Sequence, residues 1–226
     1  MAFSHSPKIV TDGLILCLDA VDKNSYPGSG TTWSDLSPNG NDGTLSAAAI
    51  GTDVPGSMDF DGSSEYITFG VTNLPSGTAD VSLSIWCIPT ESSDSGLFGY
   101  GSATSNTTFE IYMYNHGGTL RPAVHYAGGN SGYTGGLGLN LNEWNHIAAT
   151  YDKTSSRIYV NGELSITDAQ ALTIATTYRH IATRNYAAPT GEFFDGKISS
   201  AQIYNRALSS KEVSQNFNAQ RSRFGV

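Results

Sequence analysis

The fold is decided by a stretch near the end of the chain, which reads Gly191-Glu192-Phe193-Phe194-Asp195-Gly196-Lys197-Ile198 and then Ile203-Tyr204-Asn205-Arg206-Ala207-Leu208-Ser209-Ser210-Lys211-Glu212-Val213. The pattern predicts a closing β-strand, a tight break and a capped helix. Ser209 can cap the helix, and Glu212, three residues later, can accept a hydrogen bond from the amide of the cap. Leu208 and Val213 flank the cap as a hydrophobic staple. We therefore expect one helix from about Ser209 to Ala219.

Upstream of this stretch, short apolar segments alternate with polar turns. The clearest example is residues 81–87, in which Val81, Leu83, Ile85 and Cys87 alternate with Ser82, Ser84 and Trp86. This period of two predicts a β-strand. The pair Asn161-Gly162 predicts a two-residue hairpin turn, and the polar run 61–64 predicts a second hairpin that joins residues 58–60 to residues 66–69. Many short strands with regularly spaced turns predict an antiparallel sandwich.

Length and composition favour a single β-domain and argue against a nucleic-acid-binding protein. The 226 residues suit one sandwich, because all-β domains of roughly 200–250 residues are common. Charged residues make up 14% of the chain, well below the roughly 25% of typical soluble proteins. The net charge is −8, from 12 basic and 20 acidic residues, so the basic footprint that phosphate contacts require is missing. Arg221 and Arg223 are expected in a solvated C-terminal tail.

The cysteines and the N-terminal region carry no sign of a disulfide framework or an export signal. Cys17 and Cys87 lie inside predicted strands, where a free cysteine behaves as a small buried apolar residue. The apolar run 14–18 is too short for a signal-peptide core or a membrane span. We expect an N-terminal arm over residues 1–13 and a single domain over residues 14–226, with no membrane insertion.

Five segments, in order along the chain, resemble the concanavalin A-like, laminin-G-like jelly-roll modules. They are Met58-Asp59-Phe60-Asp61-Gly62-Ser63-Ser64-Glu65-Tyr66-Ile67, Ser82-Leu83-Ser84-Ile85-Trp86-Cys87-Ile88-Pro89, Glu143-Trp144-Asn145-His146-Ile147-Ala148-Ala149-Thr150-Tyr151-Asp152, Arg157-Ile158-Tyr159-Val160-Asn161-Gly162 and the closing stretch. The resemblance implies an all-β, two-sheet antiparallel jelly-roll sandwich with one short C-terminal helix. It also implies that ligands bind on the concave face or on the rim loops.

The two ends of the chain are similar to structural proteins of tailed phages, of the marine, cyanophage-like kind. The similar residues are Ile9-Val10-Thr11-Asp12-Gly13-Leu14, Leu18-Asp19-Ala20, Ser25-Tyr26-Pro27-Gly28-Ser29-Gly30-Thr31-Thr32-Trp33 and the C-terminal run from Gln215 to Gly225. In such proteins these modules decorate capsids or sit on tails and fibres. Because the module fills nearly the whole chain, the resemblance favours a capsid-surface protein over a long fibre.

The residues that catalysis would need do not form a recognisable pattern. Glucanases of this superfamily carry Glu-x-Asp-x-x-Glu on one strand, which brings two carboxylates to about 5–5.5 Å. No glutamate here is followed by aspartate two positions later, and Glu110 is interpreted as a solvated or paired carboxylate. His116, His125 and His146 lack metal-ligand spacing, and His146 is interpreted as a structural residue. We assign no catalytic residue.

Calcium is the metal that the resemblance brings into consideration, since related modules hold Ca²⁺ at a rim with carboxylates and carbonyl oxygens. Asp59 and Asp61 are the candidate ligands. The alternative is that these side chains stabilise their own turn. Many relatives carry an acidic pair where this chain has Ser199-Ser200, which weakens the calcium hypothesis. No cofactor is required on this interpretation.

Glycan binding needs aromatic rings that stack on sugars and polar groups that bind the hydroxyls. The candidate ligand-binding residues are Tyr112, Tyr114, His116, Tyr126, Asn130 and Tyr133. The alternative is that the tyrosines fill the sandwich and that the glycine-rich loop from Tyr126 to Gly138 packs against a neighbouring subunit.

Our interpretation of the sequence is a non-enzymatic virion structural protein, displayed on the phage surface as a capsid decoration with weak glycan binding. The expected partners are other virion proteins, host surface glycans and further copies of the chain, with synthesis in the host cytoplasm. The alternative is a tail-associated receptor-binding lectin, and a glycoside hydrolase comes third.

Overall fold

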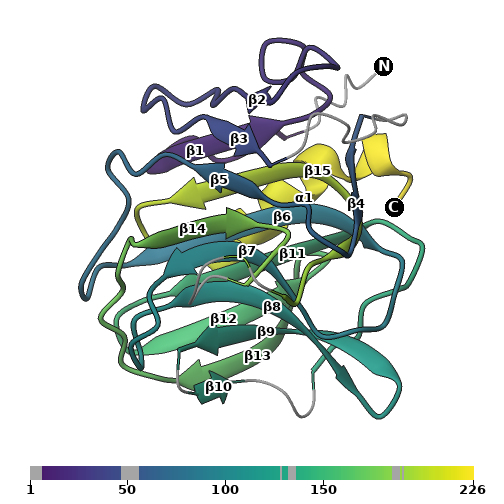
Figure 1. Cartoon of the computed structure of the whole chain (residues 1–226). Helices are drawn as coiled ribbons and strands as arrows, with labels where there is room; N and C mark the ends of the chain where they lie inside the picture. The colour runs from purple at the N-terminus through teal and green to yellow at the C-terminus, as the bar shows by residue number, and fades with distance from the viewer. Residues whose placement is uncertain (1–6, 47–55, 128, 132–135, 185–188, 190) are drawn as a thin grey trace, which may run out of the picture.

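The protein is a two-layer sandwich of antiparallel sheets with one helix on its outside (Figure 1). The computed structural model describes residues 7–46, 56–127, 129–131, 136–184, 189 and 191–226. The predicted all-β jelly-roll architecture with a C-terminal helix is therefore confirmed.

The first layer is a seven-stranded sheet. Its strands in spatial order are β1 (Leu14–Asp19), β15 (Asp195–Tyr204), β6 (Val81–Pro89), β11 (Asn145–Tyr151), β12 (Ser155–Val160) and β13 (Glu163–Ala169). The seventh, β4 (Met58–Asp61), pairs with the first half of β15, whereas β1 pairs with the second half. The β12–β13 hairpin turns at Asn161-Gly162 with φ of 50° and 81°, as the sequence predicts.

The second layer is an eight-stranded sheet. In spatial order it contains β10 (Gly129–Ser131), β9 (Thr119–Tyr126), β8 (Phe109–His116), β7 (Ser95–Gly101), β14 (Tyr178–Ile181), β5 (Ile67–Phe69), β3 (Gly43–Leu45) and β2 (Thr32–Trp33). The predicted hairpin over residues 58–69 is wrong, because β4 and β5 join different sheets. The polar turn 61–64 carries the chain from one layer to the other.

The hydrophobic core lies between the two sheets and is built from alternate residues of each strand. The seven-stranded sheet contributes Leu16, Leu18, Leu83, Ile85, Ile147 and Ala149, and the eight-stranded sheet contributes Phe98, Tyr100, Phe109, Ile111 and Val124. All are buried. Cys87 belongs to this core, and both Cys87 and Cys17 are buried free thiols, as expected. Burial raises the pKa of the Cys17 thiol to about 12.

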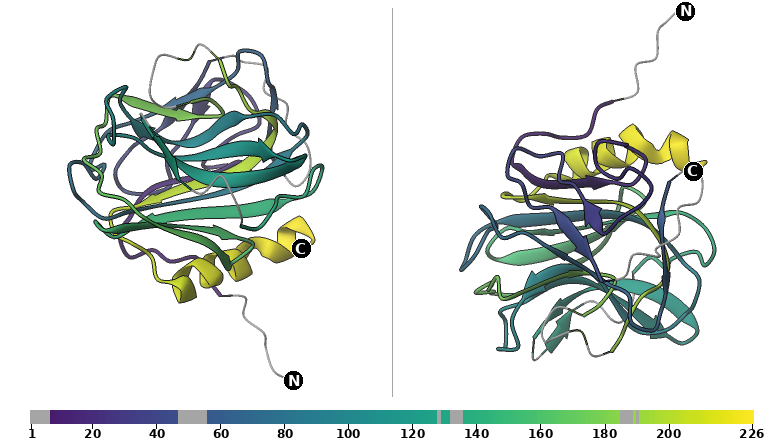
Figure 2. Two further views of the ribbon diagram at one scale, coloured as in Figure 1. Left: turned by 90° about the horizontal axis from the view of Figure 1, so that it is seen from below. Right: turned by 45° about the horizontal axis from the view of Figure 1, so that its top comes forward.

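Helix α1 (Ser210–Phe224) covers the outer face of the seven-stranded sheet (Figure 2). The predicted capping box is present, with Ser209 and Glu212 bonded reciprocally, and Leu208 and Val213 are buried in one cluster. The ring of Phe224 stacks on the Trp86 indole at a centroid distance of 4.2 Å. The helix therefore covers the part of this face around Trp86.

The helix is longer than predicted, because its last turn makes tertiary contacts. It ends at Phe224 rather than near Ala219, and Gly225 closes it in the left-handed conformation with φ of 73°. The expectation that Arg223 lies in a solvated tail is wrong. Arg223 forms an ion pair with Asp19, at 2.8 Å between Nη1 and Oδ2, and its guanidinium lies over the Phe224 ring.

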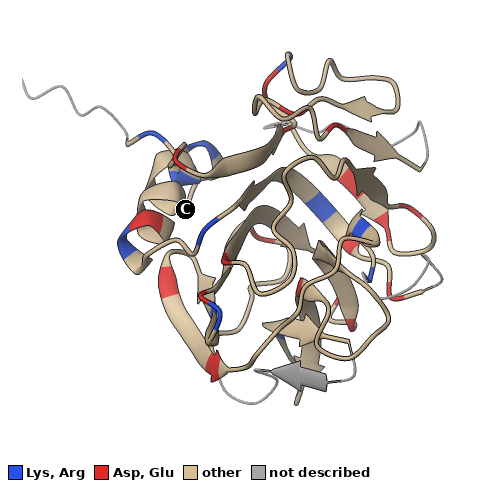
Figure 3. Ribbon diagram, turned by 90° about the vertical axis from the view of Figure 1, so that its left-hand side faces the viewer, with Lys and Arg blue, Asp and Glu red and all other residues tan. Residues whose placement is uncertain are grey.

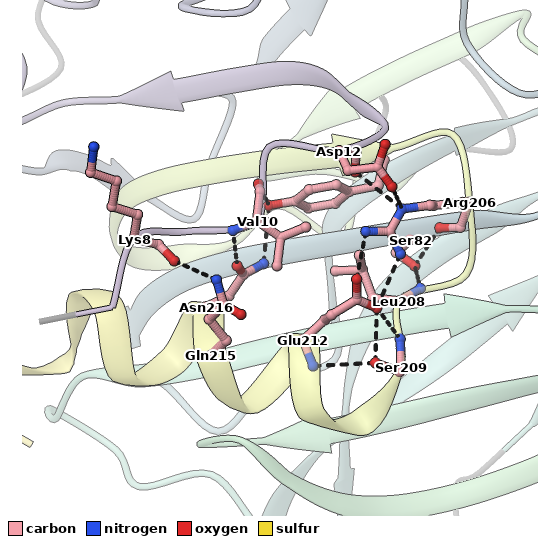
Figure 4. Close-up of polar contacts among 11 residues, drawn as sticks. Lys8, Val10, Asp12, Ser82, Arg206, Leu208, Ser209, Glu212, Gln215 and Asn216 are labelled. Atoms are coloured by element: carbon pink, nitrogen blue, oxygen red, sulfur yellow. Dashed lines mark hydrogen bonds and ion pairs between the residues drawn. The ribbon is translucent and has the colours of Figure 1, made fainter.

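The described part of the N-terminal arm lies along α1 (Figure 4). The amide of Val10 donates to Oδ1 of Asn216 at 2.8 Å, and the hydroxyl of Tyr204 donates to the carbonyl oxygen of Val10 at 3.1 Å. Asp12 pairs with Arg206, which also holds Glu212 of the capping box. Residues far apart in the sequence thus form one polar cluster around the start of the helix.

Charges of both signs are spread over strands and loops in the view of Figure 3. The ion pairs that hold the described surface are mostly short and partly exposed, such as Arg157 with Asp152 and Lys197 with Asp59. Among the described residues, no helix is long and apolar enough to cross a bilayer.

Candidate glycan-binding face

The outward face of the eight-stranded sheet carries a transverse row of polar residues from neighbouring strands. The strand register aligns His180 of β14 with Gly99 of β7, Gly99 with Glu110 of β8, and Glu110 with His125 of β9. Glu110 and His125 alternate along their strands with core residues, so their side chains point away from the core. Buried ionisable groups on a face that the core does not use mark this row as a functional-site candidate.

A connected network joins this row to a loop that follows β14. Nδ1 of His125 lies 3.3 Å from Oε2 of Glu110, and both side chains are buried. On the other side of the ring, Nε2 of His125 lies 3.2 Å from Nη2 of Arg184. Arg184 also pairs with Glu192, and its guanidinium lies 5.4 Å from the ring centroid of Tyr112. The network therefore holds one arginine in place from three directions.

His180 extends the row towards β5. Burial lowers the pKa of His180, while the nearby carboxylate of Glu110 acts in the opposite direction. The ring of Tyr66 meets the imidazole edge to face at 5.7 Å, and the ring of Tyr178 lies 6.3 Å away. An uncharged, aromatic-flanked imidazole can donate or accept a hydrogen bond.

A glycine lets the loop approach the sheet. A Cβ atom on Gly96 of β7 would lie 2.3 Å from the amide nitrogen of Arg184 and 2.4 Å from the carbonyl carbon of Thr183. The backbone of residues 183–184 therefore rests directly on the strand, and the amide of Gly96 donates to the carbonyl oxygen of Glu192 at 3.0 Å. The position of Arg184 depends on this close approach.

A second set of side chains follows the β8–β9 hairpin along the same face. Tyr112, Tyr114 and His116 occur at alternate positions of β8, and the rings of Tyr114 and His116 lie 6.1 Å apart. The register places Arg121 of β9 opposite Tyr114. Tyr112 is buried beneath Arg184, Tyr114 and Arg121 are half-buried, and His116 is exposed. We call Tyr112, Tyr114, His116, Arg121 and Arg184 the hairpin stripe.

The candidate residues from the sequence divide into two groups. Tyr112, Tyr114 and His116 share the outward face. Tyr126 does not join them, because it points into the core and its hydroxyl group bonds to that of Ser156. Asn130 lies in β10, paired in register with His125, and only its backbone is described. Tyr133 lies outside the described residues. That these residues bind a ligand stays a prediction.

The two calcium candidates have other partners. Asp59 pairs with Lys197, at 3.1 Å between Oδ1 and Nζ. Asp61 accepts hydrogen bonds from the amide and hydroxyl groups of Ser63, which lower the pKa of its carboxyl group. Within the described ranges, no three His, Cys, Asp or Glu side chains are arranged to hold a metal ion. The contacts of Asp61 fit the alternative, in which the aspartate stabilises its own turn, whereas Asp59 pairs with a residue of the neighbouring strand.

The sequence interpretation missed Arg121, His180, Arg184 and Glu192. One sequence signal could have predicted the positions of Arg121 and of the Glu110–His125 pair. Gly117-Gly118 forms a two-residue turn with φ of 62° and 83°, which aligns His116 with Thr119 and so fixes the whole hairpin register. Arg184 and Glu192 come from a loop segment, and no periodic pattern places them.

Comparisons with known proteins agree with this architecture. The family model described as the concanavalin A-like lectin/glucanases superfamily matches residues 61–214. Comparison with curated protein sequences finds no significant match. Solved structures with the same fold include domain 4 of AbnA, a GH43 extracellular arabinanase from Geobacillus stearothermophilus in complex with arabinotriose. Its TM-score is 0.68 at 18% identity, covering 94% of this chain and 99% of that domain.

Two further structures extend the comparison. The Trypanosoma rangeli sialidase aligns with a TM-score of 0.68 at 19% identity, over 97% of this chain and 36% of the sialidase. The binding domain of botulinum neurotoxin serotype D aligns with a TM-score of 0.60 at 13% identity, over 92% of this chain and 52% of that domain. This chain thus spans about a third of the sialidase, and these likenesses concern the fold alone. The family match and the two-sheet jelly roll together show that the chain belongs to the concanavalin A-like lectin/glucanases superfamily.

Proposed function

We propose that this protein is a non-enzymatic glycan-binding module whose binding face is the outward side of the eight-stranded sheet. The observation that carries the proposal is the network in which Glu110 and His125 hold Arg184 over the Tyr112 ring. Aromatic rings, a guanidinium and imidazoles in one place supply the stacking and hydrogen bonding that sugar recognition needs.

The opposite side of the sandwich supports the choice of face. The outer surface of the seven-stranded sheet is partly covered by α1, with Phe217 and Phe224 both stacked on Trp86. On the eight-stranded sheet, by contrast, the polar side chains of Glu110 and His125 are buried on the outward side. Burying polar side chains costs free energy, and packing of the core does not require them there. Their retention on an outward face is explained if they position groups that contact a ligand.

The proposal that the module is non-enzymatic rests on the surroundings of Glu110. Its register neighbours on the outward face are Gly99 and His125, and the next residue of β8 on that face is Tyr112. A retaining glycosidase needs a second carboxylate about 5–5.5 Å from the first. Where that second carboxylate would stand, the residues beside Glu110 in the sheet supply imidazole and phenol groups instead.

The test is a glycan array with a matched pair of variants. We expect the wild-type protein to bind a subset of polysaccharides, Tyr114→Ser to reduce that binding, and Leu164→Ser to leave it unchanged. Leu164 is exposed on the edge strand of the other sheet, so it controls for the loss of a surface hydrophobic group. A flat array for the folded wild-type protein would overturn glycan binding, and cleavage of a bound glycan would overturn the non-enzymatic assignment.

The second candidate function is structural display on a phage particle, with the capsid favoured over the tail. It is supported by the resemblance of both chain ends to phage structural proteins, and in this structure the described N-terminal residues pack on the C-terminal helix. The partners would be other virion proteins. Mass spectrometry of purified particles tests this candidate: tens to hundreds of copies support a capsid position, few copies a tail position, and absence excludes it.

A further inference from the structure

We infer that the hairpin stripe selects anionic glycans, carrying carboxylate or sulfate groups, and that Arg121 is the residue that recognises the anionic group. The inference deepens the proposed function and rests on it. It starts from the position of Arg121 in the β8–β9 hairpin, opposite Tyr114 and on the same face as Tyr112 and His116.

Arg121 differs in its partners from the other described arginines of the two sheets and their loops. Arg184 pairs with Glu192, Arg157 with Asp152, and Arg179 donates to three backbone carbonyl oxygens. Arg121 forms no ion pair with any described residue. Its single hydrogen bond to the described residues is long, with Nη1 at 3.5 Å from the carbonyl oxygen of Gly136. Within the described part of the chain, a positive charge on the proposed binding face therefore has no carboxylate partner.

The guanidinium of Arg121 is also held at the surface rather than freely solvated. Its Nε atom is buried and has no hydrogen-bond partner, which carries a free-energy cost for a charged donor. A planar guanidinium with donors to spare matches the paired oxygens of a carboxylate or a sulfate. Because the side chain is already partly immobilised, binding an anionic group would lose less conformational entropy.

The neighbours of Arg121 favour an anion on a sugar over a free anion. The ring of Tyr114 lies across the strand pair from Arg121, and the ring of His116 lies 6.1 Å from that of Tyr114. A pyranose ring can stack on these rings while its acidic substituent meets the guanidinium. At the other end of the stripe Arg184 is neutralised by Glu192, so that end suits hydroxyl groups.

The negative charge of the whole protein does not oppose this selection at physiological salt. The net charge is −8, but exposed charges are screened beyond about 8 Å at physiological ionic strength. The carboxylate of Glu192, at the Arg184 end of the stripe, is engaged by that arginine. Local charge at Arg121 therefore decides the preference, and the affinity for acidic glycans should fall as salt is raised.

Calorimetric titration with three probes tests the inference: oligogalacturonate for carboxylate, carrageenan oligosaccharides for sulfate, and laminari-oligosaccharides as the neutral arm. We expect one acidic probe to bind more tightly than the neutral probe, and Arg121→Gln to weaken that binding about 10- to 100-fold. Lys211→Gln removes an equal charge from an exposed site on α1, and its affinity should match that of the wild type. Comparison of the affinities for the carboxylate probe and the sulfate probe identifies which anionic group is preferred.

The outcomes separate this inference from the proposed function. Binding of the neutral probe as tightly as the acidic ones, or an equal loss for all three probes in Arg121→Gln, would overturn the selection by Arg121. Absence of binding to any glycan would overturn the proposed function itself. Should Arg121→Gln fail to fold, Arg121→Lys keeps the charge without the planar fork, and we expect about a tenfold loss for the acidic probe only.

Discussion

The Nε2 atom of His146 lies 2.9 Å from the hydroxyl oxygen of Ser84, and both side chains are buried between the seven-stranded sheet and α1. The imidazole packs against Trp86 at 5.2 Å and against Phe217 at 5.9 Å between ring centroids. Burial lowers the pKa of His146 to about 3. The folded protein therefore keeps this histidine neutral throughout the mildly acidic range, as the structural interpretation of His146 requires.

This pKa predicts that acid destabilises the fold well above the range in which carboxylates titrate. Below pH 6.5 the unfolded chain binds a proton at His146 and the folded chain does not, so stability falls as the pH drops from 6.5 towards 3. The slope from this residue approaches 1.4 kcal/mol per pH unit. Urea unfolding between pH 7 and pH 5 measures it.

The matched variant is His146→Gln, which can keep a hydrogen bond to Ser84 without a titrating group. We expect its free energy of unfolding to decline less steeply over the same range. His180 is also buried with a lowered pKa and remains in both proteins, so the difference between the two profiles isolates His146. Parallel profiles would contradict the prediction.

The capping box predicts a measurable contribution of a single exposed hydroxyl group. The Oγ atom of Ser209 accepts from the amide of Glu212, and the Glu212 carboxylate accepts from the amide of Ser209 at 2.8 Å. Replacing a serine cap by alanine costs about 1 kcal/mol, so Ser209→Ala should lower the free energy of unfolding by that amount. Ser210→Ala, one residue into the helix and exposed, should change it by less than about 0.5 kcal/mol.

The cap also has a pH signature. Hydrogen bonds from Arg206 and Ser209 lower the pKa of Glu212 to about 2. The stabilisation from this carboxylate is complete above its ordinary pKa of 4.5 and is lost as the pH falls towards 2. The Ser209 hydroxyl also donates to this carboxylate at 2.8 Å, and Ser209→Ala removes that bond while keeping the backbone bond. The deficit of Ser209→Ala should therefore shrink in strong acid, and a constant deficit down to pH 2 would argue against the bond from the hydroxyl to the carboxylate.

Local signals were sufficient for the parts of the fold that depend on neighbouring residues. Ser209 and Glu212 are three residues apart, and Asn161-Gly162 forms its turn alone, so pattern predicted both. The end of α1 could not be predicted in this way. Its last turn is stabilised by the contact of Phe224 with Trp86 and by the ion pair of Arg223 with Asp19, which join residues more than a hundred positions apart.

The candidate site shows the same division. Alternation along β8 predicts that Tyr112, Tyr114 and His116 share a face, and the structure places them so. Tyr126 was grouped with them by proximity in the sequence, but alternation along β9 turns it into the core with Val124. Arg184 reaches the face through a loop whose path depends on packing against Gly96, which one sequence does not reveal.

Gly96 gives a test of that loop path. A methyl group at this position would overlap the backbone of Thr183 and Arg184, and overpacking of this kind costs about 1–3 kcal/mol. We expect Gly96→Ala to lower thermal stability and to weaken glycan binding, because Arg184 is displaced. Gly191→Ala is the control, since a Cβ atom there has no neighbour within 4 Å among the residues that the structure describes. Equal behaviour of the two variants would show that the loop does not rest on β7.

Asn216 is expected to hold the N-terminal segment on the helix. Its Oδ1 atom accepts from the amide of Val10, its Nδ2 atom donates to the Tyr204 hydroxyl at 3.0 Å, and that hydroxyl donates to Val10, which closes a ring of three buried hydrogen bonds. Removing one member leaves the other polar groups buried without partners, at about 1–3 kcal/mol. Asn216→Ala should therefore destabilise the protein by that amount.

Hydrogen exchange distinguishes this ring from a general loss of stability. In Asn216→Ala the amide of Val10 should exchange much faster, while amides of the central strand β6 should change only as far as global stability falls. Asn218→Ala is the matched control, because Asn218 is exposed and bonds only within its own helix, to Ser214. If Val10 and β6 exchange change in proportion, or if the two variants behave alike, the N-terminal segment is held by other contacts, such as the ion pair of Asp12 with Arg206.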